Sequence, residues 1–395
     1  YLLTQYMINM STSMLNERFS DYIRTMRASG ELETLREKWF SEDESIKTMI
    51  DLAALPATNG TLHLAATGTQ VPFNYVRDNT IVGFEIELAA RFCEENGYGL
   101  QVEQMNFDGV LASVQSGKCD FACACLAVTD ERKESVDFSE PHFAESVVFV
   151  VLDSMAVKQE SFLGAIADSF QKTFLRENRW KLFLEGVGTT LLITVLSILF
   201  GTLLGFLVFM LCRNGNPVAN TITRFCVWLV RGMPVVVLLM ILYYIIFGSV
   251  AIPGTAVAVI GFTLVFGAGV YGIIKSGVGA IDKGQLEAAY ALGYTNRRAF
   301  YRVILPQAMP HFMPAYKSSI TEIIKATAIV GYIAVQDLTR ASDLIRARTM
   351  DAFFPLLATA AIYYLSCRLL ARALGALVAR CDVRNRPRTI EGVEL

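Results

Sequence analysis

The sequence has few charged residues, few histidines and no cysteine pair spaced for a metal ion. Charged residues make up 18% of the 395-residue chain, and the histidines are three, His63, His142 and His311. The eight cysteines include no C-x-x-C pair, so zinc-ligand spacing and a dithiol redox motif are both absent. Cys123 and Cys125 alternate along an apolar run, which favours buried free thiols. We therefore predict no metal site and no cofactor held by this chain.

Sequence motifs for catalysis are also missing. There is no G-x-x-x-x-G-K-[ST] phosphate loop, no catalytic triad and no paired-carboxylate arrangement above chance, so this chain is not expected to hydrolyse ATP or to be an enzyme. The net charge of −2 gives no indication of a nucleic-acid partner. The chain begins at Tyr1 without a signal segment, and we expect further sequence upstream.

Long uncharged apolar runs are abundant. Hydrophobic residues make up 53% of the chain, and the mean hydropathy is +0.41. Both values are typical of membrane proteins. Gly248 and the Ile252-Pro253-Gly254 turn divide one uncharged stretch into two spans. The sequence predicts five transmembrane helices, near 186–212, 233–250, 255–274, 320–335 and 352–370.

Positive charge is concentrated on alternate connections. The 213–224 turn, the 275–311 loop and the 380–388 tail are rich in arginine and lysine, whereas the 249–254 turn has neither. In the 336–351 loop three arginines are offset by three aspartates: Arg340, Arg346 and Arg348 against Asp337, Asp343 and Asp351. The positive-inside rule therefore places the 275–311 loop and the C-terminus in the cytoplasm and the N-terminal part outside.

The N-terminal part has the pattern of an α/β unit. Residues 61–151 begin with a strand at 62–64, continue with helices from 84 and 107, and reach a small apolar run at 120–128 that is typical of a strand covered on both faces. This order predicts a mostly parallel sheet. Residues 1–40 have apolar residues at helical spacing on both sides of Gly30, and residues 41–60 are a predicted linker.

A connector precedes the membrane spans. In residues 152–185 four apolar side chains stand four apart among lysines and arginines: Phe162, Ile166, Phe170 and Phe174. A basic helix with an aromatic stripe fits the membrane interface, and docking on the membrane core is an equal alternative. A transmembrane domain at 186–380 and a cytoplasmic tail at 381–395 complete the predicted organisation.

The most specific pattern lies at 284–306, where the sequence reads E-A-A-x3-G-x9-V-x-L-P from Glu287 to Pro306. It resembles the EAA loop of ABC importer permeases, and an ordinary amphipathic helix-turn-helix is the alternative. The resemblance implies docking on a cytoplasmic ATPase, which itself binds ATP and Mg²⁺. The implied coupling residues are Gly284, Gln285, Glu287, Ala288, Ala289, Gly293, Leu305 and Pro306.

Further motifs extend this resemblance through the membrane half. G-x-x-T-T-L from Gly186 and R-G-x-P from Arg231 are similar to permeases of the polar amino-acid uptake family. The resemblance implies a type I importer fold, two permease subunits around one pathway and a bacterial plasma (inner) membrane location. Lys325 and Thr327 are candidates for the pathway, because a lysine within a span is costly without a partner or water. Snorkelling of Lys325 is the alternative.

The segments GTQVPF, GFEIEL, FDGVLASVQSGKCDF, LAVTDER and VDFSEPHF resemble, in order, the first lobe of amino-acid receptors of the periplasmic-binding-protein type 2 class. The second lobe is absent. Residues 1–40 resemble the closing helices of such a receptor, either from an upstream receptor unit in tandem or as a piece that completes the lobe at 61–151. The implied ligand-binding residues are Gln70, Phe107, Cys125, Ala127 and Arg132.

Arg132 takes the place that binds the ligand α-carboxylate, a task suited to a bidentate guanidinium. A solvated arginine in a degenerate domain is the alternative, since likeness of fold does not establish a site. The whole pattern predicts the permease subunit of an ATP-driven importer of polar amino acids, fused to receptor-like sequence. A ligand-gated channel or membrane sensor is the alternative function, and the EAA-like loop favours the importer.

Overall fold

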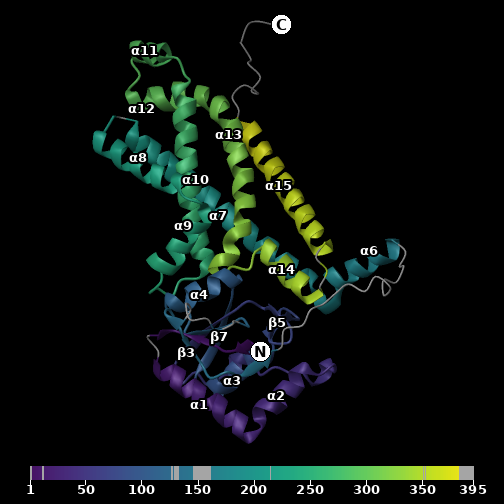
Figure 1. Cartoon of the computed structure of the whole chain (residues 1–395). Coiled ribbons are helices and arrows are strands. Elements are labelled where there is room, and N and C mark those ends of the chain that lie inside the picture. Colours follow the sequence, from purple (N-terminus) through teal and green to yellow (C-terminus); the bar gives the residue numbers. More distant parts are fainter. Residues whose placement is uncertain are drawn as a thin grey trace. The chain divides into compact units, whose positions relative to one another are not determined.

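The computed structural model describes residues 2–10, 13–125, 128, 133–145, 162–213, 215–349, 351 and 353–381. The chain divides into two compact units (Figure 1). The first comprises Tyr1–Thr189, Leu239–Val257 and Ala328–Thr359, and the second comprises Thr190–Leu238, Ala258–Thr327 and Ala360–Leu395. The first contains an α/β lobe, and the second consists of helices.

A five-stranded mixed sheet forms the centre of the lobe, with the order β7-β3-β8-β2-β9. β3 runs parallel to β7 and β8, whereas β2 is antiparallel to β8 and β9. The expected α/β lobe is confirmed, but the sheet is mixed rather than mostly parallel, because β2, from the start of the chain, is inserted antiparallel between β8 and β9. The strands are β2 (Met7–Ile8), β3 (Thr61–Ala66), β7 (Gly99–Gln104), β8 (Phe121–Cys123) and β9 (Asp137–Phe138).

Smaller elements surround this sheet. A three-stranded antiparallel sheet is formed by β4 (Thr69–Gln70), β5 (Asn74–Arg77) and β6 (Thr80–Val82), and β1 (Leu2–Thr4) pairs with β10 (Phe143–Glu145). The two helices predicted in this region are present as α3 (Phe84–Glu95) and α4 (Phe107–Gln115). The linker contains two short turns, η2 (Glu44–Ile46) and η3 (Leu52–Ala54).

Residues 1–40 share one hydrophobic core with residues 61–143. α1 (Ser13–Ser29) and α2 (Glu31–Phe40) are separated by Gly30, as the sequence indicates. Phe19 and Trp39 are buried in the same cluster as Phe84 and Phe92, and the rings of Phe19 and Phe92 meet edge to face at 4.7 Å. Figure 1 shows α1 and α2, in purple, against α3. The two segments, distinct in the sequence, therefore form a single folded lobe.

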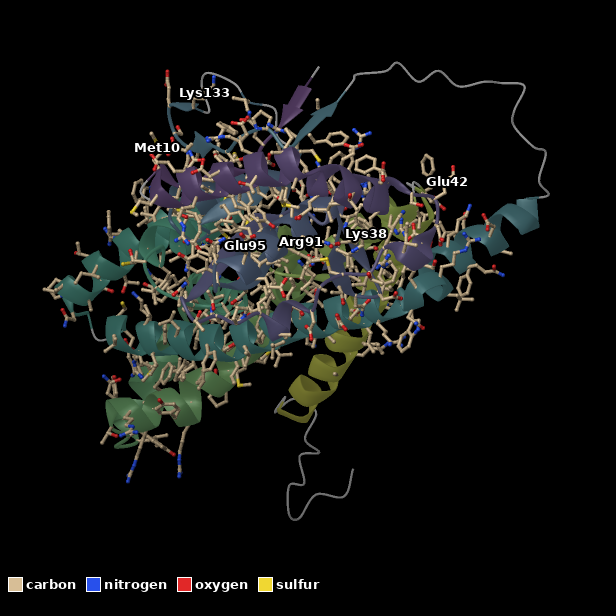
Figure 2. The ribbon with its side chains drawn as sticks, turned by 90° about the horizontal axis from the view of Figure 1, so that it is seen from below. Met10, Lys38, Glu42, Arg91, Glu95 and Lys133 are labelled. Carbon is tan, nitrogen blue, oxygen red and sulfur yellow. The ribbon has the colours of Figure 1, made fainter. Side chains whose placement is uncertain are left out.

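A buried carboxylate joins the two segments. Glu87 on α3 is 1% exposed, yet Lys38 Nζ lies 2.7 Å from its Oε2 and Arg91 Nη2 lies 2.8 Å from its Oε1. Trp39 Nε1 also donates to Oε2, at 2.7 Å. Figure 2 labels Lys38 and Arg91. Because a buried charge is tolerated only when it is paired and hydrogen-bonded, these contacts specify how α2 lies on α3.

We predict that Trp39→Ala destabilises the lobe by about 3–5 kcal/mol, because it removes a fully buried aromatic side chain and the donor to Glu87. Met14→Ala, on the exposed part of α1, is the control and is expected to stay within about 0.5 kcal/mol. Both changes are measured by denaturant unfolding of the purified full chain. Cleavage within residues 1–145 by limited proteolysis reports the unfolded fraction, since this signal does not depend on the tryptophan that is removed. Equal stability of the two variants would contradict a common core.

The connector is broken rather than one continuous helix. α6 (Phe162–Phe170) continues into the π-helical turn η4 (Gln171–Leu175), and η5 (Arg176–Asn178) ends it before α7 (Trp180–Cys212). The Phe174 ring lies 5.1 Å from those of both Phe170 and Phe183, and 6.5 Å from that of Phe354 at the start of α15. This part of the aromatic stripe packs against the first turns of two long helices, and residues 152–161 lie outside the described residues.

Three helices are long and apolar enough to cross a membrane: Trp180–Cys212, Gly254–Gly279 and Phe354–Ala373. Two bent pairs raise the number of candidate spans to as many as five, namely Pro217–Gly232 with Val235–Ile246, bent by 108°, and Asn296–Ile333 with Leu338–Thr349, bent by 57°. The corresponding elements are α8 (Pro217–Gly232), α9 (Val235–Met240), η6 (Ile241–Ile246), α10 (Gly254–Gly279), α13 (Leu305–Ala326), η8 (Thr327–Ile333), α14 (Leu338–Thr349) and α15 (Phe354–Cys381).

Two predicted boundaries differ from the structure. Residues 213–224 are not a simple turn, because α8 begins at Pro217: the Asn216 side chain accepts hydrogen bonds from the amides of Val218 and Ala219, and proline suits the first helical position. The fourth predicted span, 320–335, is the end of a longer helix that begins at Leu305. Polar residues in the first turns of that helix conceal its start in a hydropathy pattern.

Small residues allow α7 and α10 to pack closely in the second unit. A Cβ added at Gly205 would lie 2.7 Å from the Gly267 carbonyl oxygen, and one at Gly201 would lie 2.9 Å from the Phe266 ring. Glycine is therefore required where the two backbones approach. This is the usual means of association for membrane helices, which gain nothing from hydrophobic burial against lipid.

Candidate functional site

An open pocket of about 600 Å³ lies beside the carboxyl ends of β3 and β7 in the first unit. In open α/β sheets this edge is where ligands bind, because strand ends and the loops that follow them present free backbone groups there. We call it the edge pocket. Its lining residues are Thr67, Thr69, Gln70, Asn106, Phe107, Asp108, Tyr332, Arg340, Asp343, Arg346 and Ala347.

Two of the five predicted ligand residues line the edge pocket. Phe107 is 48% exposed there. Gln70 donates from Nε2 to the Ala124 carbonyl at 3.0 Å, so its amide is tied to the end of β8. Cys125 is partly buried against the lobe core and is not a lining residue. Ala127 and Arg132 lie outside the described residues, and their roles stay predictions.

The other wall of the edge pocket comes from α14, in the loop before the last long helix. From the sequence, Arg340, Asp343 and Arg346 are offsetting charges of that loop, whereas the structure shows that they line a pocket. A partial signal was present: the three recur at i, i+3 and i+6 of a predicted loop, a spacing that puts them on one side of a helix. Their position over the lobe is a tertiary property that no spacing reveals.

Arg340 anchors α14 to the lobe. It is 4% exposed, and its guanidinium donates to the carbonyl of Thr67, to the carbonyl of Met105 at 2.9 Å and to Asn106 Oδ1 at 3.1 Å. Thr67 follows β3 and Met105 follows β7, so one side chain bridges the ends of both strands. Burial lowers the pKa of Arg340 to about 10, and the group therefore remains charged at neutral pH.

The electrostatics of the edge pocket are balanced in sign. Asp343 Oδ1 lies 3.2 Å from Arg346 Nη1, and both side chains are a third or more exposed. Partial burial raises the pKa of Asp343 above its ordinary value, while Arg346 and Arg340 oppose that rise. Ion pairs this exposed contribute about 0–1 kcal/mol, so the partners separate at little cost.

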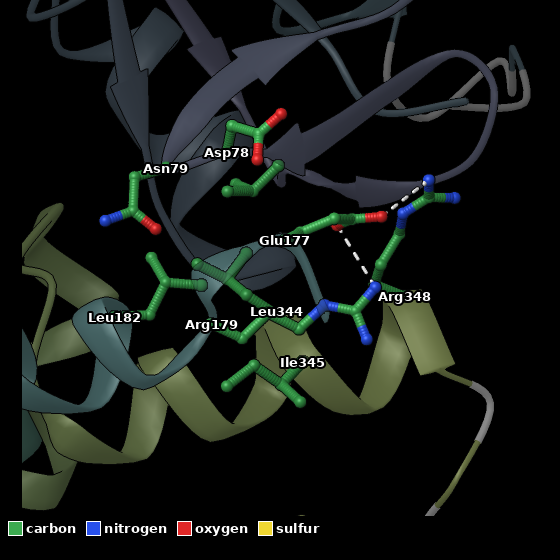
Figure 3. Close-up of a pocket in the computed structure, with 9 residues that line it drawn as sticks. Asp78, Asn79, Glu177, Arg179, Leu182, Leu344, Ile345 and Arg348 are labelled. Carbon is green, nitrogen blue, oxygen red and sulfur yellow. Dashed lines mark hydrogen bonds and ion pairs between the residues drawn. The ribbon is translucent and has the colours of Figure 1, made fainter. Parts of the chain in front are cut away.

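The far end of α14 is held by a second group of charges. Arg348 Nη2 lies 3.1 Å from Glu177 Oε1, and Arg179 Nη2 lies 3.1 Å from Glu177 Oε2, as Figure 3 shows. The Arg348 guanidinium also lies 4.9 Å from the centre of the Tyr75 ring. The cavity among these residues is about 10 Å³, room for about one water molecule, so this cluster is structural rather than a ligand site.

We predict that Arg340→Met frees α14 from the lobe, because the carbonyls of Thr67 and Met105 lose a charged donor. The expected cost is about 2–4 kcal/mol, and amide hydrogen exchange across Leu338–Thr349 is expected to rise by about tenfold or more. Arg346→Met, on the same helix but paired only at the surface, is the control and should change exchange little. Unchanged protection in Arg340→Met would show that its bonds do not hold the helix.

In the second unit, the EAA-like loop is a compact helical turn. α11 (Lys283–Ala291) is capped at its N-terminus by Asp282, whose side chain accepts a hydrogen bond from the Gly284 amide at 2.6 Å. Gly293 has φ of 78°, a conformation that favours glycine, and the Tyr294 amide donates back to the Ala289 carbonyl at 3.1 Å. α12 (Asn296–Ala299) and the π-helical turn η7 (Phe300–Ile304) then lead into α13.

Contacts with neighbouring helices hold this loop in place. The Arg213 guanidinium at the end of α7 lies 4.0 Å from the centre of the Phe300 ring and donates to the Asn296 carbonyl at 3.2 Å. Gln307 on α13 donates to Gln285 Oε1 at 3.0 Å. Together these contacts hold α11 against the start of α13, with Pro306 near the N-terminus of that helix.

The predicted coupling residues divide into an exposed and a buried set. Glu287 and Ala288 are exposed, whereas Ala289 is buried within the loop and so belongs to its own packing. Leu292, at the C-terminal end of α11, is 78% exposed. The remaining predicted residues are exposed or partly buried: Gly284, Gln285, Gly293, Leu305 and Pro306.

The two pathway candidates lie where α13 passes into η8. Thr327 is fully buried, and its hydroxyl donates to the Ile324 carbonyl at 2.7 Å. Lys325 is exposed in the isolated chain. Within the described part of the chain, no group of three or more histidine, cysteine, aspartate or glutamate side chains could hold a metal ion.

Comparison with known proteins shows similarity to two kinds of protein. The model of the bacterial extracellular solute-binding proteins, family 3, matches residues 62–328. The protein named as the glutamine transport system permease GlnP in Rickettsia conorii (strain ATCC VR-613 / Malish 7) is 33% identical over 192 residues, which is 47% of this chain and 87% of that protein. The L-cystine transport system permease protein TcyB of Bacillus subtilis (strain 168) is 30% identical over 210 residues, 53% of this chain and 90% of that protein.

Among solved structures, a crystal structure of an amino acid ABC transporter with histidines matches with 29% identity and a TM-score of 0.47, covering 56% of this chain and 99% of the other. The chain therefore belongs to two families joined in one polypeptide, the solute-binding proteins of family 3 and the permease proteins of amino-acid ABC transporters.

Proposed function

We propose that this chain is the permease subunit of an ATP-driven importer of amino acids, with a receptor-derived lobe on its extracytoplasmic side. Membership of the permease family carries this proposal, and the named cargoes of the relatives, glutamine and L-cystine, support an amino acid as the transported molecule. Five spans are proposed near 186–212, 233–250, 255–274, 320–335 and 352–370, with α14 in the extracytoplasmic loop that precedes the last span. The protein is then a multi-pass protein of the bacterial plasma (inner) membrane.

Coupling to ATP hydrolysis is proposed to pass through the EAA-like loop. Its exposed surface offers a carboxylate, Glu287, and a large apolar side chain, Leu292, and helices commonly dock in grooves of other proteins through such exposed apolar side chains. The contacts of Arg213 and Gln307 make the loop stiff enough to transmit force to α7 and α13. The positive charge of residues 275–311 supports a cytoplasmic position for this loop.

The proposed assembly has a cytoplasmic ATPase dimer and a second permease subunit, identical or homologous. ATP and Mg²⁺ belong to the ATPase, and the amino acid passes between the two permease subunits by alternating access. Lys325 and Thr327 are proposed to line that pathway. An ammonium group within a span is expensive in lipid unless it meets a partner or water, so Lys325 is expected to face polar contents.

We predict that Glu287→Lys lowers amino-acid uptake by about tenfold or more and abolishes co-purification of the ATPase, because it reverses a charge at the centre of the proposed contact. Leu292→Asp is expected to do the same by removing the apolar contact. The tagged chain is purified from native membranes, the accompanying ATPase is identified by mass spectrometry, and uptake of radiolabelled glutamine is measured in cells.

Glu42→Lys, the same charge reversal at an exposed site of the linker, is the control and should leave both measurements unchanged. If no ATPase accompanies the wild-type chain and Glu287→Lys leaves uptake intact, the importer proposal fails and a ligand-gated channel or sensor takes its place.

A further inference from the structure

An apolar groove of about 490 Å³ lies in the second unit, among residues of α7, α13 and α15, which Figure 1 labels. We call it the membrane groove. Tyr316 lines it from α13 and Leu370 from α15. The rest of the lining is one face of α7, on which residues three or four apart lie together: Val195, Ile198, Leu199, Thr202, Leu203 and Phe206. None of these residues is a candidate for ligand binding, ATPase coupling or the transport pathway.

The hydroxyl groups of the membrane groove are already paired with each other and with the backbone. Thr202 donates to the Ile198 carbonyl at 2.6 Å, and Tyr316 donates to Thr202 Oγ1 at 2.7 Å. The Tyr316 ring also lies 5.8 Å from that of Phe266 on α10, so its position is fixed from a second side. The other lining side chains are hydrocarbon, and none of the lining residues is charged. A charged or strongly polar ligand would lose its water there without replacement, so the groove suits an apolar ligand.

The membrane groove lies at the level of the acyl chains. Its α7 residues fall within the proposed span 186–212, on both sides of the middle of that span. From Val195 to Phe206 the helix rises about 16 Å, at about 1.5 Å per residue. The hydrocarbon core of a bilayer is about 30 Å thick, so the acyl chains of one leaflet extend over about 15 Å. The length of the groove therefore matches that of one acyl chain, and headgroups lie beyond it.

The size of the membrane groove decides between an acyl chain and a protein helix. A volume of about 490 Å³ spread over about 16 Å gives a mean cross-section of about 30 Å². An α-helix with its side chains is about 10 Å across, a cross-section of about 80 Å², so a helix of a second copy cannot enter. Water is unsuitable too, because apolar cavities without polar partners stay dry. An unbranched hydrocarbon chain is narrow enough, and it restores dispersion contacts that an empty groove loses.

We propose that the membrane groove binds one acyl chain of a membrane phospholipid. The chain lies along α7 against Leu199 and Leu203, which are 60% and 55% exposed in the isolated protein, and its other side contacts Tyr316 and Leu370. The lipid thereby fills the space between α7 and the other two helices. Because the lining is hydrocarbon, recognition depends on the length of the chain and not on the charge of the headgroup. This inference requires that α7 cross a membrane, and it does not depend on transport.

The test is native mass spectrometry of the full chain, released from nanodiscs that contain phosphatidylethanolamine and phosphatidylglycerol with the same long acyl chains. The wild-type chain is expected to retain one phospholipid, with either headgroup. Leu203→Trp places an indole in the groove and is expected to lower the retained lipid by about tenfold or more, because the two compete for the same space. A dihexanoyl phospholipid, whose chains are too short to fill the groove, is expected not to be retained.

Leu207→Trp is the matched control. Leu207 lies one turn further along α7, is 50% exposed and does not line the membrane groove, so this variant should retain lipid as the wild type does. Equal helix content of the two variants by circular dichroism shows that both are folded. Equal lipid retention in Leu203→Trp and Leu207→Trp would overturn the proposal, and so would retention of one headgroup alone.

A second measurement needs no substitution in the protein. Nanodiscs of the wild-type chain are prepared with a phospholipid that carries a photoreactive diazirine in the middle of one acyl chain, or in the headgroup. The acyl-chain probe is expected to label peptides that contain residues 195–206, and the headgroup probe is expected not to label them. Labelling by the headgroup probe, or crosslinks between two copies of the chain in place of lipid, would refute the assignment. Either result leaves the importer proposal standing where the ATPase still co-purifies.

Discussion

The buried guanidinium of Arg340 determines where α14 lies, and the edge pocket depends on that position. A guanidinium has several donors in one plane, so it can satisfy the carbonyls that follow two neighbouring parallel strands at the same time. Thr67 and Met105 supply those carbonyls, and Asp337 caps the same helix by accepting from the Arg340 amide at 2.9 Å. A lysine has no such planar fork and could not bridge both strand ends.

In the lobe, the order of the strands in the sheet differs from their order along the chain. β2 is near the start of the chain, yet it lies between β8 and β9, which come more than a hundred residues later. The place between β8 and β9 can be filled by any strand of suitable register. Met7 and Ile8 are apolar and pair with β8 on one side and with β9 on the other. α1 then packs against β2 and β9, and α2 lies on α3, where Glu87 fixes it by bonds to Lys38 and Trp39. Residues 1–40 thus contribute the strand β2 and the helices α1 and α2, which residues 61–145 lack.

Prediction from the sequence succeeded where a pattern was long and local. α3, α4 and the apolar spans have nine or more residues with a consistent periodicity, and the 284–306 motif has enough defined positions to place Gly293 at a turn. It failed for strands of two or three residues such as β2 and β9, which are too short to show alternation. It also failed at α8 and at the start of α13, where polar residues and prolines are mixed with apolar ones.

The sequence by itself determined the families to which the chain belongs, its apolar spans and the exposed carboxylate of its EAA-like loop. Each of these properties depends on residues that are close together in the chain. The tertiary structure alone decided that residues 1–40 complete the lobe and that α14 forms a wall of the edge pocket. Both depend on contacts between residues far apart in the chain, Trp39 with Glu87 and Arg340 with Thr67. A buried donor must be paired, and its acceptor is the group that folding brings next to it. Such hydrogen bonds therefore depend on the tertiary fold and not on neighbouring residues in the sequence.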